Sequence, residues 1–136
     1  MEFVAIFGFL LLVFVLFQVL FFNSKDAAQQ ERAALWAQKT AKEIAAKINL
    51  VSESTGMRTQ FEVTQNLGDA GLAYYITVTN STVSVGYNYG GTGKNAHAPV
   101  RVRTINNGAG SAVFNLSTGF YWANNTGGII YVVKKS

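Results

Sequence analysis

The N-terminal segment Phe3–Phe22 constrains this chain more than any other feature, because it runs for twenty residues without a charge or a proline. It contains one glycine, Gly8, and one amide, Gln18. At about 1.5 Å per residue, a helix of this length reaches about 30 Å, the thickness of the hydrocarbon core of a bilayer. A helix that is apolar on every side has no face for water. The segment therefore predicts a membrane span, a helix buried in an assembly, or both at different times.

The segment lacks the features of a cleaved secretory signal, which has a basic start, an apolar core of about 7–15 residues and a small-residue cleavage site. Here Glu2 precedes the apolar run, and the run ends in Leu20-Phe21-Phe22-Asn23. We therefore expect the segment to be retained. A carboxylate in the first helical turn is favoured by the helix dipole but is costly in lipid. Glu2 is thus expected to pair with an α-amino group, its own or that of a neighbouring copy.

The helical pattern continues beyond Phe22 in an amphipathic form. Neither proline nor glycine occurs in residues 23–55, and Gly56 suits the left-handed residue that follows a helix. We predict one nearly continuous helix of about 52 residues, with Asn23-Ser24 as the one place for local softening. Small and apolar residues recur at spacings of three and four, as in helices that pack on neighbours. They are Ala27, Gln30, Ala34, Ala37, Ala41, Ile44, Ile48 and Val51.

Two partners are expected for this amphipathic half. One face, which includes Leu35 and Trp36, should pack on the C-terminal domain of the same chain. The alanine face should pack against helices of other copies, because alanine allows close approach.

From residue 57 the composition changes to Thr, Val, Tyr, Asn and Gly, and the hydrophobic period changes to two, which indicates strands. About seven strands are expected, at residues 60–64, 74–78, 83–89, 100–104, 112–116, 120–123 and 129–133. The second and third should form a hairpin, Arg101 and Arg103 should lie on the solvent side of a strand, and residues 89–99 should form an exposed loop.

The predicted fold class is α+β, with a long N-terminal helix, apolar and then amphipathic, followed by a compact antiparallel sheet or sandwich. The expected domains are a helical region at 1–56, divided into 1–22 and 23–56, and a β-rich head at 57–136.

The head offers little for catalysis, nucleotide binding or metal binding. The chain has no cysteine, and therefore no disulfide or thiolate metal site. The run Gly90–Asn95 resembles a phosphate-binding loop, but Asn88 and Asn95 occupy two of its fixed positions. His97 is the only histidine, and Glu62 and Asp69 are the only acidic residues of the head. We expect no enzymatic activity, no cofactor and no metal, with His97 at the surface.

The net charge of +4 arises entirely in the C-terminal part, whose bases are Arg58, Lys94, Arg101, Arg103, Lys134 and Lys135. They are dispersed, so a solvated basic surface is expected and a nucleic-acid partner is disfavoured. Three N-glycosylation sequons begin at Asn80, Asn115 and Asn124, each at a predicted turn. They favour an exported, glycosylated surface.

Met1-Glu2-Phe3 followed by VAIFGFLLLVFVLFQ resembles the end of the archaeal class III signal motif, Gln-x-Ser-x-Glu-Phe, and residues 1–50 resemble the type IV pilin superfamily. The resemblance implies a membrane precursor, cleavage by a prepilin peptidase, and assembly into a helical filament by an ATPase and its platform. It also implies that Glu2 pairs with an α-amine in the growing filament. The family's glutamate lies several residues into the mature chain, so either residues precede Met1 in the gene product or processing differs.

The first functional hypothesis is the major subunit of an archaeal adhesive pilus, a homopolymer on the cell surface whose heads meet surface or host ligands. The second is an archaellin, although archaellins begin with small, glycine-rich residues. The third is a single-pass membrane anchor that presents a ligand-binding β domain, and a DNA-uptake pilin is a fourth. The expected assembly residues are Glu2, Phe3, Phe7, Leu11, Phe14, Phe17, Ala34, Ala37, Ala41, Ile44 and Ile48.

Overall fold

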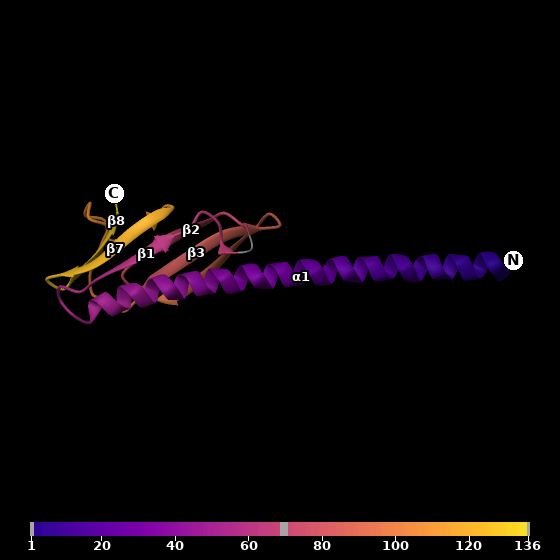
Figure 1. Ribbon diagram of the computed structural model, residues 1–136, viewed down its shortest axis with the longest axis horizontal. Coiled ribbons are helices and arrows are strands. Elements are labelled where there is room, and N and C mark those ends of the chain that lie inside the picture. Colours follow the sequence, from indigo (N-terminus) through magenta and orange to yellow (C-terminus); the bar gives the residue numbers. More distant parts are fainter. Residues whose placement is uncertain (1, 69–70, 136) are drawn as a thin grey trace. The chain divides into compact units, whose positions relative to one another are not determined.

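The computed structural model of the chain describes residues 2–68 and 71–135 (Figure 1). Helix α1 spans Glu2–Ser52 and is 51 residues long. It continues through Asn23-Ser24 and ends where the sequence predicted, and Gly56 follows it with a φ of 88°. The chain divides into two compact units within this helix, Met1–Arg32 and Ala33–Ser136, whereas the sequence suggested a boundary after Gly56. The last part of α1 therefore belongs to the head.

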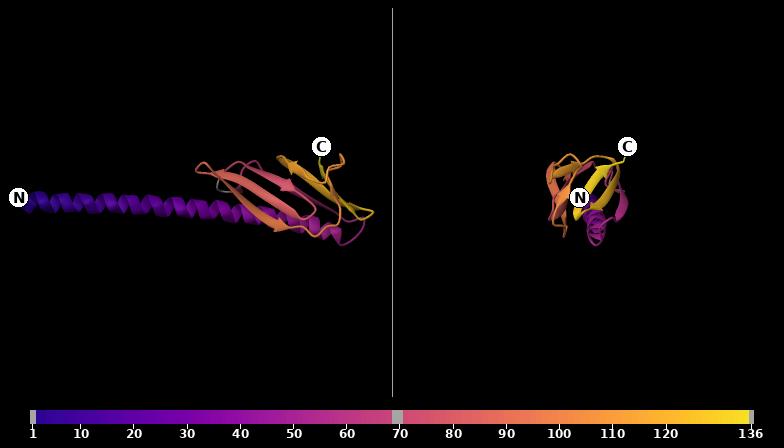
Figure 2. Two further views of the ribbon diagram at one scale, coloured as in Figure 1. Left: turned by 180° about the vertical axis from the view of Figure 1, so that it is seen from behind. Right: turned by 90° about the vertical axis from the view of Figure 1, so that its left-hand side faces the viewer.

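The described part of the head contains eight strands rather than the seven expected. They are β1 (Arg58–Val63), β2 (Tyr74–Val78), β3 (Thr82–Tyr89), β4 (Thr92–Pro99), β5 (Ile105–Asn106), β6 (Phe114–Leu116), β7 (Gly119–Thr126) and β8 (Ile129–Lys134). They form sheet A, in the order β1-β7-β8-β5, and sheet B, in the order β4-β3-β2-β6. The right-hand view of Figure 2 shows the two sheets as separate layers.

The pairing within both sheets is antiparallel except for the parallel pair β5–β8. The α+β class and the sandwich are therefore confirmed. The predicted hairpin between β2 and β3 is present as well.

The prediction of an exposed loop at residues 89–99 was wrong. Strand β4 pairs with β3 along its whole length, and Gly90 and Gly91 connect them with φ values of 58° and 80°. Two successive positive φ values make the tight turn whose twist suits a hairpin. The inward positions of β4 are Ala96 and Ala98, which are buried. Alanine has a weak strand preference, so the alternation along β4 was not visible as a hydrophobic pattern.

Residues 100–104 are not a strand, although their two valines are buried and their two arginines are exposed, as the alternation predicted. At its two ends this backbone bonds to other backbone groups, since the Val100 N–H donates to the Ser81 carbonyl at 2.9 Å and the Thr104 carbonyl accepts from the Ile130 N–H of β8 at 3.0 Å. Next to Val100 the chain bonds to a helix side chain. Asn49 Nδ2 donates to the carbonyl of Pro99 at 3.2 Å, and the Arg101 N–H donates to Asn49 Oδ1 at 2.7 Å. The pattern gave the burial correctly but not the hydrogen-bond partner.

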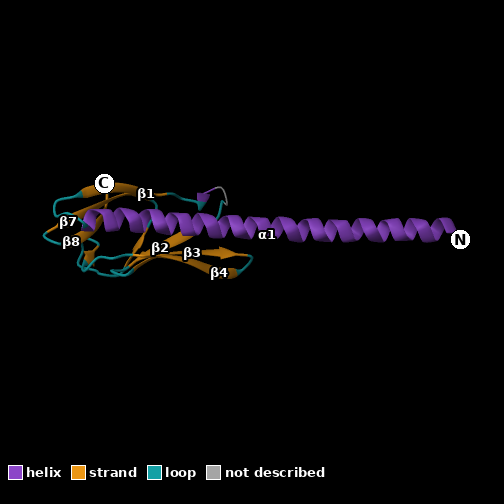
Figure 3. Ribbon diagram, turned by 90° about the horizontal axis from the view of Figure 1, so that it is seen from below, coloured by secondary structure: helices purple, strands orange, loops and turns teal. Residues whose placement is uncertain are grey.

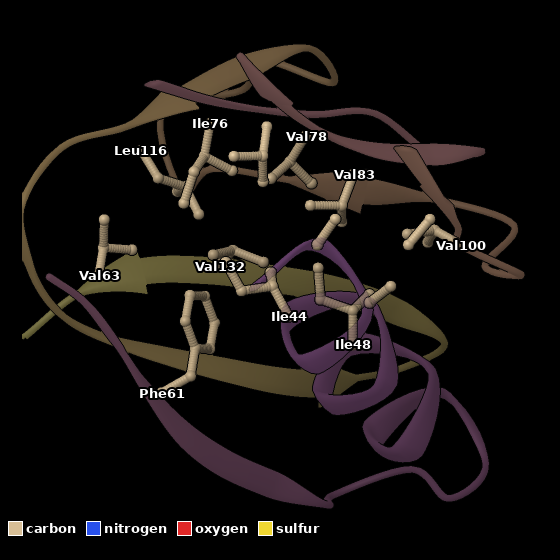
Figure 4. Packing of buried hydrophobic residues seen from close by; sticks show 14 of the residues in the cluster. Ile44, Ile48, Phe61, Val63, Ile76, Val78, Val83, Val100, Leu116 and Val132 are labelled. Carbon is tan, nitrogen blue, oxygen red and sulfur yellow. The ribbon is translucent and has the colours of Figure 1, made fainter. Parts of the chain in front are cut away.

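The C-terminal part of α1 lies between edge strands β1 of sheet A and β4 of sheet B (Figure 3). Gln38 Nε2 donates to the carbonyl of His97 on β4 at 3.0 Å. Edge strands present unpaired backbone groups, and covering them with a helix is one way to satisfy these groups. Figure 4 shows Ile44 and Ile48 directed into the core with Phe61 of β1 and Val83 of β3.

From Ala37 to Val51 the stripe is buried against the head, which corrects the assignment of four assembly residues, whereas Ala27 and Gln30 are exposed. Ala37, Ala41 and Ile48 have no exposed surface, and Ile44 is 3% exposed. Leu35, which was expected on the head side, is 65% exposed. Small side chains allow the helix to approach both sheets closely, so the narrow face fits the open side of the sandwich.

Two other predictions for this half of the helix had different outcomes. Trp36 packs against the core as expected. Ala34 is exposed and remains free to contact another copy.

Candidate assembly surface

Residues 2–32 form a helix with every described side chain exposed. The large apolar side chains of the segment 3–22 range from 36% exposed at Val13 to 80% at Phe3. An 18-residue window has a mean hydropathy of 2.9 and no buried residue, so by length and composition this helix can cross a membrane. Soluble monomers rarely expose contiguous apolar patches larger than about 300–600 Å². This surface therefore indicates membrane insertion or assembly.

The predicted assembly residues of this segment all contribute to the exposed surface. Phe7, Leu11, Phe14 and Phe17 are 61%, 54%, 62% and 71% exposed. Glu2 lies in the first turn of α1 and is exposed too. Lys39 Nζ lies 4.0 Å from Glu43 Oε1 in the second half of α1. The pairing of Glu2 with an α-amine stays a prediction.

The outer face of sheet A carries aromatic and basic side chains that the sequence analysis did not bring together. Trp122 of β7 has the Arg58 guanidinium 3.7 Å and the Lys135 ammonium 5.4 Å from its ring centroids. Phe120 and Val133 on the same face are 47% and 39% exposed. The alternation within each strand indicates which side chains share a face of that strand. The strand register, which places Trp122 beside Gln60 and Val133, is needed to show that the side chains of different strands are neighbours.

The described residues contain no group of three histidine or acidic side chains that could hold a metal ion. His97 is exposed on β4, as predicted, and Glu62 is exposed on β1 of the other sheet. Asp69, the other acidic residue considered, lies outside the described residues. Gly90 and Gly91 form the hairpin turn described above. The positive φ values of this turn account for the glycines that produce the resemblance to a phosphate-binding loop.

The three sequons have different surroundings. Asn80 is exposed between β2 and β3, at a turn as predicted. Asn115 lies within β6, where its Oδ1 accepts a hydrogen bond from Thr77 Oγ1 at 2.8 Å. Asn124 lies within β7 and is half-buried, with an Oδ1 that is buried and has no hydrogen-bond partner. The predicted turn at 124–128 is thus shorter, at Gly127-Gly128.

Asn125 joins the end of α1 to sheet A, a role that the sequence analysis missed. Its side chain is 4% exposed, and its Nδ2 donates to the Val51 carbonyl at 2.9 Å. Its Oδ1 accepts from the Gly128 N–H at 3.1 Å, and its own carbonyl accepts from the Gly56 N–H at 2.7 Å. The last four carbonyls of a helix have no partner within the helix. Asn125 satisfies one of them and so anchors α1 to β7.

Comparison of the chain with protein-family models, with curated proteins and with solved structures gave no match. The architecture itself, a long apolar N-terminal helix followed by β-sheets, is pilin-like. Such a topology suggests a filament subunit.

Proposed function

We propose that this chain is the major structural subunit of an archaeal type IV-like pilus that mediates attachment to surfaces. The exposed apolar surface of residues 3–22 carries the proposal. Burying one large apolar side chain contributes about 1.5–3 kcal/mol. Burying this many of them contributes more than the whole net stability of a typical domain, about 5–15 kcal/mol, so the segment is driven strongly into a water-free environment.

Two environments satisfy this need in turn. In the precursor the segment lies in the cytoplasmic membrane, and in the extracellular filament it packs against the same segment of other copies, with the heads outside. A prepilin peptidase processes the precursor, and an assembly ATPase with its platform moves subunits from lipid to filament. Glu2 pairs with the α-amine of a neighbouring copy, a contact that fixes register more than it adds stability.

The head serves as the outer surface of the filament and has no catalytic role. Sheet A presents the aromatic and basic side chains around Trp122, and Asn80 and Asn115 are the exposed glycan acceptors of the three sequons, with Asn80 at a turn. Attachment to surface or host ligands takes place through this exposed surface.

Shearing of cells that produce the chain tests the proposal. We expect filaments in electron micrographs of the sheared fraction, with this chain as their main protein by mass spectrometry. A deletion strain should lose attachment and keep swimming; the reverse phenotype would identify an archaellin instead.

A single-pass membrane anchor is the second candidate, because the same helix has the length and hydropathy of a membrane span. It predicts that the chain stays in the membrane fraction as single copies and that no sheared filament contains it.

A further inference from the structure

Gln18 is the only side chain between Phe3 and Phe22 that can donate and accept hydrogen bonds. Its amide has two N–H donors and an oxygen acceptor. Glu2 is sixteen positions away along the helix, which is about 24 Å. The amide therefore stands alone within the apolar surface of its own helix.

The side chains around Gln18 form a hollow on the helix surface. Phe14, Phe17, Phe21 and Phe22 line it together with Gln18, and its volume is about 390 Å³. Phe21 and Phe22 meet edge to face, with centroids 6.3 Å apart. Phe14, Phe17, Gln18 and Phe21 stand at i, i+3, i+4 and i+7, the four positions that surround a hole in knobs-into-holes packing of helices. Each of the aromatic side chains is more than 60% exposed, so the hollow is open to a partner.

The chemistry of the amide favours a protein partner over lipid. A lipid chain can fill the hollow, but it leaves the amide without a hydrogen bond, at a cost of roughly 2–7 kcal/mol. A second copy of the helix supplies a side chain for the hollow and an amide for Gln18. Polar side chains, glutamine included, form such contacts between apolar helices in membranes.

We propose that the hollow around Gln18 is a contact between copies of this chain, in which Gln18 hydrogen-bonds to Gln18 of a neighbouring copy. This inference rests on the proposed filament function and names the residue that selects the register of the apolar helices. An amide is self-complementary, because each group donates an N–H and accepts at its oxygen. Apolar packing alone tolerates sliding between helices, whereas one polar position among apolar ones specifies register.

Cross-linking in intact cells tests the contact directly, since the chain has no cysteine of its own. The Gln18→Cys variant is treated with a bifunctional thiol reagent. The length of the reagent matches the span of two glutamine side chains joined by a hydrogen bond. Leu16→Cys and Leu20→Cys are the matched controls, because they lie within about 3 Å of the same depth but about 160° from Gln18 around the helix. We expect several-fold more cross-linked dimer from the variant at position 18. Equal or lower yield than in the controls would overturn the proposal.

A second variant separates register from assembly. Gln18→Leu keeps the apolar volume but removes the hydrogen bonds, so we expect filaments that no longer share a single helical symmetry in electron cryo-microscopy. Variant filaments with the single symmetry of the unaltered chain would overturn the inference while leaving the filament function intact. If the unaltered chain forms no filaments and position 18 gives no dimer in membranes, both proposals fail.

Discussion

Asn125 shows how one side chain fixes the end of a long helix to a sheet. Among the described residues it is the one buried polar residue, and both ends of its amide have partners, the Val51 carbonyl and the Gly128 N–H. When both the N–H and the oxygen of a buried amide are hydrogen-bonded, the side chain fixes the position of the backbone and leaves no polar atom unpaired. The same residue is the middle position of the Asn124 sequon, where no helix or strand pattern points to a structural role.

Removing this amide should destabilise the head. Asn125→Ala leaves the Val51 carbonyl buried without its donor, so we expect the free energy of unfolding to fall by about 1–3 kcal/mol. Urea unfolding of the detergent-solubilised full chain measures it. Asn95→Ala is the control, because Asn95 is exposed on β4, and it should change stability by less than about 0.5 kcal/mol. Equal losses in the two variants would contradict the anchoring role.

The Gly90-Gly91 turn gives a second test at the scale of single residues. Gly91 has a φ of 80°, which costs a residue with a Cβ about 1–2 kcal/mol. Gly91→Ala should lower the free energy of unfolding by that amount. Gly93→Ala is the control, because its Cβ would come no closer than 3.7 Å to Asn88 Oδ1 and its φ is not positive. Similar stability of both variants in chemical denaturation would show that the turn does not need its glycine.

At the scale of elements, the central relation is between the C-terminal part of α1 and the two edge strands beside it. The helix presents a narrow alanine face to the open side of the sandwich, and Gln38 and Asn49 bond to the backbone beside that face. Spacing alone indicated an interacting stripe, but it could not say which partner the stripe meets. Small residues allow close packing on the edge of a sandwich as well as on another helix. The folded head is needed to show which of these two partners the stripe contacts.

The direction of the alanine face can be tested by enlarging one alanine on each side. Ala41→Leu places three additional carbons where no surface is exposed, so overpacking should cost about 1–3 kcal/mol. Ala34→Leu, on the exposed side of the same helix, should stay within about 0.5 kcal/mol of the unaltered chain. Thermal unfolding in detergent compares them. A larger loss at position 34 would mean that the helix packs on the head by another face.

For the molecule as a whole, the sequence predicted what depends on local periodicity. The single helix, the β-rich head, the β2–β3 hairpin and the alternation at residues 100–104 all follow from periods of 3.6 and two. Features that depend on pairing over long distances were not predicted, as with the parallel β5–β8 pair and the face around Trp122. Strand β4 was missed because its inward residues are alanines.

A single charge placed in the apolar segment should disturb filament assembly more than it disturbs membrane insertion. Phe14→Glu lies in the hollow beside Gln18, where a carboxylate has no cation among the lining residues. One charge in twenty apolar residues costs about 2.5–3.5 kcal/mol in the membrane, so the chain should remain in the membrane fraction but give no sheared filaments. Val113→Glu, at a head residue that is 60% exposed, should assemble normally. Filaments from the Phe14→Glu variant at normal yield would contradict burial of this surface between copies.

The most direct test of the whole account is a helical reconstruction by electron cryo-microscopy of filaments sheared from cells that produce the chain. We expect residues 3–22 of many copies to pack against one another on the filament axis, without lipid between them, with the β heads on the outside. An axis without these helices, or sheared material from which the chain is absent while single copies remain in the membrane, would contradict it.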